Sequence, residues 1–182
     1  MDGGAHLYRL RQATPADLPG LADIRPPAAL HRDRLRDADG QGLLYLVVEE
    51  GARLIGFGLL VFEWPTAWPA VSGPVHVPLM VDVQVRPASQ GQGAGTFLIR
   101  QMEDIARGRG AAALYLQVDP VDNARARRLY LRLGYSQLPD EPHKSHWRFT
   151  DSDGAVHEGD GWQVDMRKIL AVQGRGEGAP DR

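Results

Sequence analysis

The sequence that decides the fold is LMVDVQVRPASQGQGAGT, residues Leu79–Thr96. Its first part predicts a strand over Leu79–Arg86, because apolar residues recur at every second position, the period of side chains on one face of a β-strand. The glycine-rich segment Gln90–Gly95 predicts a turn, and apolar residues at helical spacing then predict a helix over Thr96–Arg107 that ends at Gly108. The strand alternation places Leu79, Val81, Val83 and Val85 on one face and Met80, Asp82, Gln84 and Arg86 on the other.

The turn carries three alternating glycines, Gly91, Gly93 and Gly95, where the strand meets the helix. The first N–H groups of a helix lack partners, and the helix dipole gives that end a partial positive charge. Glycine has no Cβ to keep a ligand away and it tolerates positive φ, so such a turn can wrap N–H groups around a phosphate. We therefore interpret the turn as an anion site. The alternative is a tight connection that binds nothing.

A second unit follows, with a strand predicted over Ala112–Val118, a loop over Asp119–Asn123 and a helix that ends at Gly134. The segment Gln90–Gly95 resembles the Gln/Arg-x-x-Gly-x-Gly/Ala signature of the GCN5-related N-acetyltransferase (GNAT) superfamily. Asn123–Tyr135 resembles the second motif of that family, an Asn, a helix that carries Leu-Tyr, then Leu-Gly-Tyr. The two motifs occur in the right order at the usual separation, and Asp82–Pro87 resembles the family's fourth strand.

The resemblance implies an α/β (α+β) fold with a mixed, mostly antiparallel sheet of six to seven strands. This sheet is splayed at its central strand and has helices on both faces. It implies one acetyltransferase domain over residues 1–170, and the Gly-rich, charged end of the chain predicts a disordered tail over 171–182. It also implies direct transfer of an acetyl group from acetyl-CoA to a primary amine of a small molecule or protein. Homodimers are common in the family.

By motif position the resemblance assigns the pantetheine arm of acetyl-CoA to the free backbone of Val83, Gln84 and Val85. It assigns the pyrophosphate to the backbone N–H groups of the turn and adds contacts from the second motif. Asn123 also fits a helix N-cap. The predicted acetyl-CoA site is thus Val83, Gln84, Val85, Gln90, Gly91, Gln92, Gly93, Ala94, Gly95, Thr96, Asn123 and Tyr130.

Two residues are candidates for catalysis. Tyr130 lies on one helical face with apolar residues and so fits a core tyrosine; in the family a tyrosine at this position gives its proton to the leaving thiolate, which a group with a pKa of about 10 can do at neutral pH. Asp82 is a candidate general base on the central strand. It would equally bind the acceptor's ammonium group or pair with a basic neighbour, and Glu63 is a rival base.

Other polar residues are interpreted more plainly. Arg125, Arg128 and Arg132 recur along the second helix as a solvated face, with one or two of them facing the 3′-phosphate of CoA. His143 and His146 are expected to be surface residues of a hairpin loop rather than metal ligands, and no metal is predicted. The helix predicted over Ala28–Ala38 is expected to shape the acceptor pocket.

The flanking sequence predicts a meander of strands around these motifs. A helix begins at Thr14, which fits an N-cap followed by proline. Gly56 and Gly58 indicate a bulge or close packing, and the aromatic loop Trp64–Pro69 either covers the core or lines the acceptor site. The predicted strands are Leu7–Gln12, Leu43–Glu49, Arg53–Phe62, Ser136–Pro139, Trp147–Thr150 and Trp162–Ile169.

Composition limits the partners. The chain has 182 residues, a net charge of −2 and no cysteine. These values give no general attraction to nucleic acid and exclude disulfides, thiolate metal sites and a cysteine nucleophile. No apolar run reaches the roughly 20 residues that span a bilayer, and no signal peptide is visible, so we expect a cytoplasmic protein without a membrane partner.

Two other functions fit parts of the sequence. A Rossmann dinucleotide site would need G-x-G-x-x-G directly after the strand, whereas Gly91, Gly93 and Gly95 give G-x-G-x-G after a four-residue gap. A non-catalytic GNAT-like module would sense acetyl-CoA or serve as a binding partner; the presence of Tyr130 and Asp82 argues against it.

Overall fold

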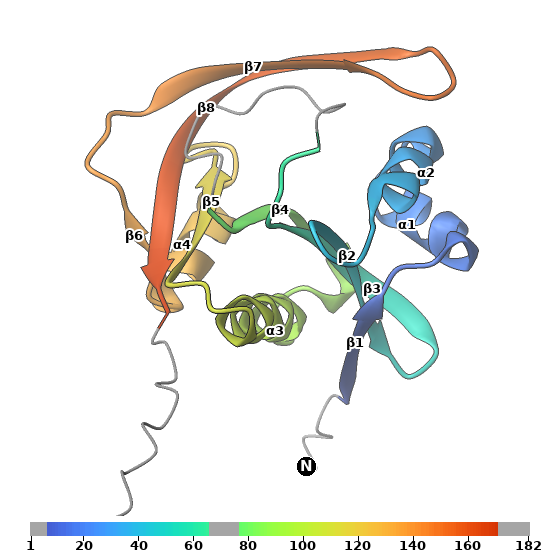
Figure 1. Ribbon diagram of the computed structural model, residues 1–182, viewed down its shortest axis with the longest axis horizontal. Helices are drawn as coiled ribbons and strands as arrows, with labels where there is room; N and C mark the ends of the chain where they lie inside the picture. The colour runs from blue at the N-terminus through green and yellow to red at the C-terminus, as the bar shows by residue number, and fades with distance from the viewer. Residues whose placement is uncertain (1–6, 66–76, 171–182) are drawn as a thin grey trace, which may run out of the picture.

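The computed structural model describes residues 7–65 and 77–170. In this part of the chain eight strands form one sheet in the order β1-β2-β3-β4-β5-β8-β6, with β7 paired to β8 (Figure 1). The strands are β1 (Tyr8–Gln12), β2 (Leu43–Glu50), β3 (Arg53–Val61), β4 (Leu79–Val85), β5 (Ala113–Val118), β6 (Ser136–Gln137), β7 (His143–Thr150) and β8 (Val156–Ile169). The predicted fold class is confirmed, with eight strands rather than six or seven.

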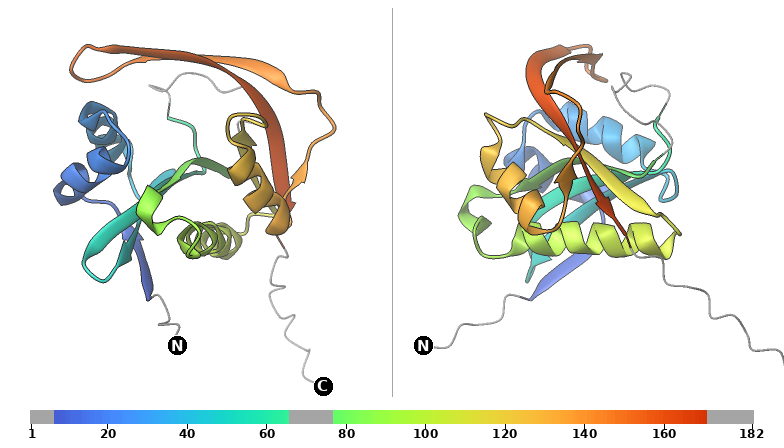
Figure 2. Two further views of the ribbon diagram at one scale, coloured as in Figure 1. Left: turned by 180° about the vertical axis from the view of Figure 1, so that it is seen from behind. Right: turned by 90° about the vertical axis from the view of Figure 1, so that its left-hand side faces the viewer.

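Four α-helices accompany the sheet in the described residues: α1 (Leu18–Ile24), α2 (Ala28–Asp37), α3 (Ala94–Gly108) and α4 (Ala124–Arg132). Figures 1 and 2 show α1 and α2 on one face and α3 and α4 on the other. Short 3-10 helices precede α1 (Pro15–Asp17) and follow β4 (Pro87–Ser89). Thr14 forms the predicted cap through a capping box with Asp17. Helix α3 begins at Ala94, two residues before the predicted start.

The sheet separates two hydrophobic cores. On the α3 and α4 side, Leu98, Ile99 and Met102 of α3 belong to one buried cluster with residues of β2–β5 and β8. On the α1 side, Leu21 packs against Tyr45 and Phe57. Strand β2 contributes alternate residues to both cores, which explains its unbroken apolar run over 43–48. Burial on both faces thus fixes β2 and its neighbours as the rigid centre of the fold.

The central strand β4 is where the sheet opens. It is parallel to β5, whereas the other strand pairs are antiparallel, and its pairing with β5 is limited to Leu79↔Tyr115 and Met80↔Leu116. Beyond Met80 the two strands part, so β5 does not pair the backbone of residues 81–85. The predicted splay at the central strand is therefore present.

A β-bulge on β4 interrupts the predicted alternation of its side chains between the two faces of the sheet. Leu59 pairs with Val81 and Phe57 with Gln84, so Gly58 faces two residues of β4, Asp82 and Val83. Asp82 adopts a φ of 51°, a left-handed conformation that Asp tolerates better than most residues. Leu79 and Val81 consequently pack on the α1 side, and Val83 and Val85 on the α3 side. The prediction that these four residues share one face was wrong.

The glycines opposite this bulge allow close approach, as predicted. A Cβ on Gly56 would lie 2.7 Å from the carbonyl oxygen of Gln84, and one on Gly58 would lie 2.8 Å from the Met102 Cε. Both distances are shorter than real Cβ contacts allow, so a side chain at either position would push β4 or the α3 packing outward.

The hairpin β7–β8 is longer than predicted. His143 and His146 lie in β7 rather than in a loop, and the ring of Trp147 lies over Gly159, where a Cβ would be 2.6 Å from it. The hairpin arches across the α1–α2 face (Figures 1 and 2). Its tip reaches α2, where the Ser152 N–H donates to Asp33 Oδ2 at 3.0 Å and Asp153 pairs with Arg32.

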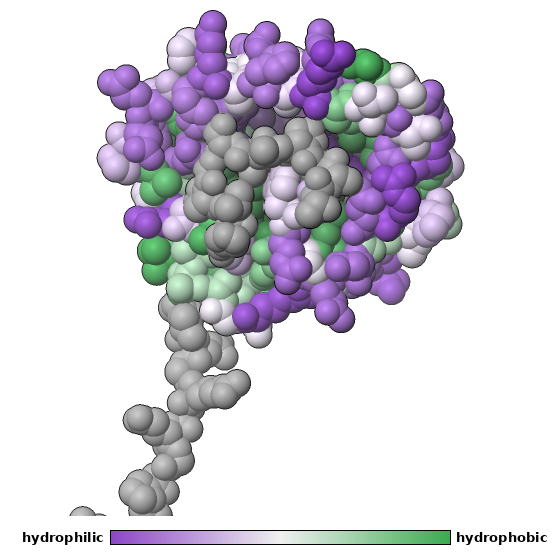
Figure 3. Space-filling model, turned by 45° about the horizontal axis from the view of Figure 1, so that its top comes forward, coloured by the Kyte–Doolittle hydropathy of each residue, from purple (hydrophilic) through white to green (hydrophobic). Residues whose placement is uncertain are grey.

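Two predictions fall largely outside the described residues. Of the aromatic loop Trp64–Pro69, Trp64 packs against the core on the α1 side, and 66–69 are not described. The predicted tail over 171–182 is likewise not described. Among the described helices, none is long and apolar enough to cross a membrane. The surface seen from the hairpin side is mostly hydrophilic, with hydrophobic residues in separate patches (Figure 3).

Candidate functional site

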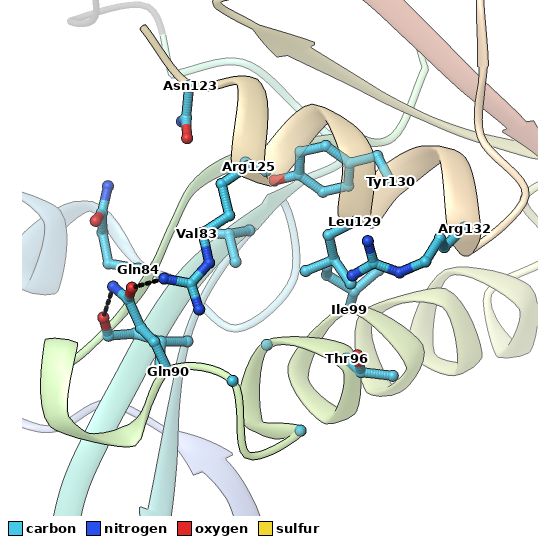
Figure 4. Close-up of a pocket in the computed structure, with 15 residues that line it drawn as sticks. Val83, Gln84, Gln90, Thr96, Ile99, Asn123, Arg125, Leu129, Tyr130 and Arg132 are labelled. Carbon is cyan, nitrogen blue, oxygen red and sulfur yellow. Dashed lines mark hydrogen bonds between the residues drawn. The ribbon is translucent and has the colours of Figure 1, made fainter.

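A pocket of about 380 Å³ opens beside the parted end of β4. Three segments meet there: the end of β4, the glycine turn with the start of α3, and one face of α4 with the Asn123 that precedes it (Figure 4). Because β4 has lost β5 as a neighbour at this point, the backbone of one wall is available to a ligand. The lining residues are Val83, Gln84, Val85, Gln90, Gly91, Gly93, Gly95, Thr96, Ile99, Asn123, Arg125, Ala126, Leu129, Tyr130 and Arg132.

The glycine turn presents backbone N–H groups to the pocket. Gly91 and Gly93 have φ values of 82° and 100°, which require glycine. Gly93 is the N-cap of α3, and no side chain within the described chain makes a capping hydrogen bond there. The backbone N–H of Phe97 donates the first hydrogen bond of the helix, to the carbonyl oxygen of Gly93. The N–H groups before Phe97 and the helix dipole therefore form a concave site suited to an anion.

Three side chains fix this turn in place. Gln90 Nε2 donates to the Val85 carbonyl at 2.9 Å, and Arg125 Nη1 donates to Gln90 Oε1 at 2.7 Å (Figure 4). From the other side the Tyr8 hydroxyl donates to the Gln92 carbonyl at 2.7 Å. The turn is thus tied to β4, to α4 and to β1. Arg125 holds a position at the pocket rather than on a fully solvated face.

The two residues of the second motif that were predicted to bind acetyl-CoA, Asn123 and Tyr130, both line the pocket. Asn123 occupies the N-cap position of α4 as predicted, but within the described residues its side chain makes no capping bond. Figure 4 shows its amide directed toward the pocket instead. Tyr130 is 7% exposed, packs edge-on against Tyr135 at 5.7 Å and turns its hydroxyl to the pocket. It is a core residue and a pocket residue at once.

The hydroxyl of Tyr130 holds its proton firmly. Burial, and secondly the negative charge of Asp82, raise the pKa of Tyr130 to about 12. The side chain is therefore a neutral hydrogen-bond and proton donor across the physiological pH range. A neutral donor that faces the pocket can hydrogen-bond to a negative charge that develops there (Figure 4).

Asp82 is enclosed rather than open. Its side chain is 6% exposed and lies between two guanidinium groups, with Arg34 Nη1 at 2.5 Å from Oδ2 and Arg25 on Oδ1. Gln84 Nε2 also donates to Oδ1, at 2.8 Å. Burial by itself would raise the pKa of Asp82, but the charges of Arg34 and Arg25 and these hydrogen bonds lower it below its ordinary value. A carboxylate stabilised in this way is a weak base, which favours the predicted alternative that it pairs with basic neighbours.

Most of the residues predicted to bind acetyl-CoA lie together around the pocket. Of the predicted acetyl-CoA residues, all but two line the pocket: Gln92 turns its side chain to the Ala88 carbonyl, and Ala94 is buried in the core. Asp82 does not line the pocket, but it accepts a hydrogen bond from Gln84, which does. Glu63 follows β3 as an exposed residue and does not line the pocket. Contact of any of these residues with acetyl-CoA stays a prediction.

Sequence reasoning missed several contributors. Ile99, Ala126 and Leu129 supply the apolar wall, and the periodicity of their helices was the available signal. Arg25 and Arg34 come from the α1–α2 segment, where they stood among other charges. Of the three basic residues considered on α4, Arg125 and Arg132 line the pocket and Arg128 does not.

The comparisons with known proteins agree with this geometry. The family model for the acetyltransferase (GNAT) family matches residues 7–135. The chain is 44% identical to streptothricin acetyltransferase of Streptomyces lavendulae over 30% of its own length and 29% of that protein. It is 29% identical to mycothiol acetyltransferase of Renibacterium salmoninarum over 73% of its length and 36% of that protein. It therefore spans only about a third of these curated relatives.

A solved structure shares the fold. The structure of yncA from Salmonella typhimurium, determined with its cofactor acetyl-CoA, superposes with a TM-score of 0.60 at 23% identity, covering 96% of this chain and 98% of that one. At this level of identity the likeness concerns the fold. The residues that the family model matches include β4, the glycine turn and α4. The chain belongs to the acetyltransferase (GNAT) family.

Proposed function

We propose that this protein is an N-acetyltransferase that moves an acetyl group from acetyl-CoA directly to a primary amine of a small molecule or protein. The observation that carries the proposal is the opening of the sheet beyond Met80, directly beside the pocket that the glycine turn and Tyr130 line. Membership of the family and the acetyl-CoA in the structure of yncA support it.

The pocket residues suit the parts of acetyl-CoA. The backbone of Val83–Val85, which β5 does not pair, would hydrogen-bond the pantetheine arm as an added strand does. The uncapped N–H groups of the glycine turn would hold the pyrophosphate. The Asn123 amide would bind the arm, and Arg125 with Arg132 would meet phosphate charge. When bound, acetyl-CoA supplies a thioester whose acetyl carbon accepts the amine as the carbon–sulfur bond breaks.

Tyr130 would act as the general acid. Its hydroxyl faces the pocket and its raised pKa of about 12 keeps it protonated. A thiolate leaving group gains a proton from such a donor as the thioester is cleaved, which removes a charge that a dry site would otherwise bear. The amine must lose a proton to attack, and Asp82, despite its low pKa, and Glu63 remain the candidate bases.

Ligand binding and turnover test this function separately. A ligand present at a hundred times its dissociation constant stabilises the folded state by about 2.7 kcal/mol. For a protein of this size each kcal/mol raises Tm by roughly 2–4 °C. We therefore expect saturating acetyl-CoA to raise Tm by roughly 5–11 °C and NAD to leave it unchanged.

Turnover is measured as thiol release from acetyl-CoA over a panel of amines. We expect Tyr130→Phe to lower kcat by roughly a hundredfold or more, the usual contribution of a general acid, with little change in the acetyl-CoA shift. Tyr135→Phe is the matched control, because Tyr135 packs against Tyr130 but does not line the pocket. A shift without turnover on any amine would favour the non-catalytic sensor, and the absence of a shift would overturn the proposal.

A further inference from the structure

A charge cluster on the α1–α2 face of β4 has more positive than negative charge. Arg25 and Arg34 both pair with Asp82, so two guanidinium charges share one carboxylate. The side chains of Asp82 and Arg34 are 6% and 10% exposed, whereas that of Arg25 is 39% exposed. Charges that are largely removed from water are unfavourable unless they are compensated. The cluster therefore carries a surplus positive charge whose exposed end is Arg25.

This cluster lies across β4 from the acetyl-CoA pocket. Gln84 lines the pocket and at the same time donates to Asp82. The Asp82 charge also contributes to the raised pKa of Tyr130, so the two groups are within electrostatic reach. The bulge at Asp82 turns its carboxylate to the α1–α2 face while Val83 faces the pocket side. An acceptor that approaches the opening of the sheet from the α1–α2 face meets this cluster.

Buried side chains fix the backbone of the exposed arginine, Arg25. The Arg25 carbonyl oxygen lies 2.5 Å from His31 Nε2, and His31 Nδ1 lies 2.5 Å from the Tyr45 hydroxyl. His31 and Tyr45 are fully or almost fully buried, and burial lowers the pKa of His31, which keeps its ring neutral. The backbone at Arg25 is thus anchored in the core while its guanidinium group stays partly in solvent. A fixed planar guanidinium suits bidentate binding of a carboxylate.

The β7–β8 hairpin lies on the same side of the sheet as this cluster (Figure 1). It arches over that face and its tip is attached to α2 through Ser152 on Asp33 and Asp153 on Arg32 (Figure 1). The hairpin tip and α2 are thus joined on the same side of the sheet as the charge cluster.

We propose that the acceptor is an amine that also carries a carboxylate, and that Arg25, with Arg34 behind it, binds this carboxylate. The proposal rests on the proposed acetyltransferase function and adds the substrate class. The surplus positive charge attracts an anionic group and repels polycationic amines. Arg25 is then a specificity-determining residue, and Asp82 orients both guanidinium groups.

Matched acceptors provide the test. Thiol release is measured with a set of amino acids, with their carboxamides, which have the same shape without the charge, and with the polycation spermidine. Arg25→Gln removes the charge at a partly exposed position. Arg36→Gln is the control, because Arg36 is an exposed arginine of α2 that pairs with Asp33 and Asp37, not with Asp82. A hydrogen-bonded charge pair corresponds to roughly a tenfold effect or more.

We expect the wild type to favour at least one amino acid over its carboxamide roughly tenfold or more in kcat/KM. We expect Arg25→Gln to lose that preference through KM while its acetyl-CoA shift is unchanged, and Arg36→Gln to retain it. Turnover that favours carboxamides or spermidine, or a preference that Arg25→Gln leaves intact, would overturn this inference while the acetyltransferase function stands. Loss of the acetyl-CoA shift itself would instead overturn the proposed function.

Discussion

Replacing Asp82 by asparagine separates the charge of this residue from its backbone conformation. Asparagine has nearly the same shape and also tolerates the left-handed φ of 51°. The substitution therefore keeps the bulge but leaves Arg25 and Arg34 without their shared counter-charge. Any loss of stability or activity can then be attributed to the missing charge.

The size of the loss follows from burial. Removal of one partner of a buried ion pair costs about 3–5 kcal/mol, because the remaining charge is left uncompensated. Arg34 is buried, but water reaches part of Arg25, so we expect the lower end, about 3 kcal/mol. For a protein of this size this corresponds to a fall in Tm of roughly 6–12 °C. Urea unfolding followed by circular dichroism measures it.

A surface pair serves as control. Asp104 is 62% exposed and pairs with Arg107 one turn along α3. Such pairs contribute roughly 0.3–0.5 kcal/mol, so Asp104→Asn should unfold almost like the wild type. An Asp82→Asn variant that also unfolds within about 0.5 kcal/mol of the wild type would refute the reasoning, because it would show that the two guanidinium groups do not depend on the carboxylate.

The pH dependence gives a second check on the same residue. The pKa of Asp82 is lowered in the folded protein from its ordinary value of 3.8. A lowered carboxyl pKa stabilises the fold at pH values above the unfolded pKa, and this contribution is lost as the pH falls through the folded pKa. The stability difference between wild type and Asp82→Asn should therefore be constant near neutral pH and shrink below about pH 4.

The pH dependence of the activity of Asp82→Asn distinguishes two possible roles of this residue, general base and orienting group for the two arginines. If it is the general base, high pH deprotonates the amine without it and restores the rate of Asp82→Asn. If it orients Arg25 and Arg34, the defect persists at high pH and appears in KM for the acceptor. The low pKa leads us to expect the second result.

Two further substitutions test the close packing of β3 against β4 and a buried ion pair between β8 and α3. Gly56→Ala places a Cβ 2.7 Å from the Gln84 carbonyl oxygen, so β4 must shift. We expect the free energy of unfolding to fall by about 1–3 kcal/mol and acetyl-CoA binding, measured by calorimetry, to weaken. Gly108→Ala, which has open space around it, should match the wild type. Lys168→Met leaves Glu103, which is 3% exposed, without its 2.6 Å partner. We expect a loss of about 3–5 kcal/mol in urea unfolding, which Glu103→Gln added to Lys168→Met should largely reverse; a stable single variant would contradict this.

The elements around the glycine turn could be predicted because their signals are local. Alternation over β4, three glycines in five residues and the helical spacing of α3 each lie within a few residues of the structure they specify. The order of the two motifs then identified the family, and with it the opening of the sheet. The same information assembled most of the pocket.

The bulge at Asp82 could not be predicted in this way. Apolar residues recur at every second position from Leu79 to Val85 without interruption, and the extra residue is specified by the partner strand, where Gly58 faces both Asp82 and Val83. A pattern within one strand contains no information on such a mismatch. The predicted faces were therefore right for Leu79 and Val81 together and wrong for Val83 and Val85 relative to them.

The long hairpin escaped prediction for a related reason. Gly159 and Gly161 are poor strand formers, so this part of β8 was not predicted as strand. In the structure Gly159 provides the space that the ring of Trp147 fills from the opposite strand. A glycine that weakens a strand alone can permit a cross-strand contact that stabilises the pair.

The charge cluster shows why one residue connects both sides of the site. Arg34 lies 48 residues before Asp82 in the sequence. Only the fold therefore reveals that the single negative charge of Asp82 on β4 compensates part of the positive charge of Arg25 and Arg34. The bulge that turns Asp82 toward these arginines is the same bulge that turns Val83 and Val85 toward the pocket. The conformation that presents β4 to acetyl-CoA and the carboxylate that orients Arg25 toward an acceptor therefore depend on each other. A substitution that straightens β4 should accordingly weaken the binding of both substrates, whereas Asp82→Asn should affect chiefly the acceptor.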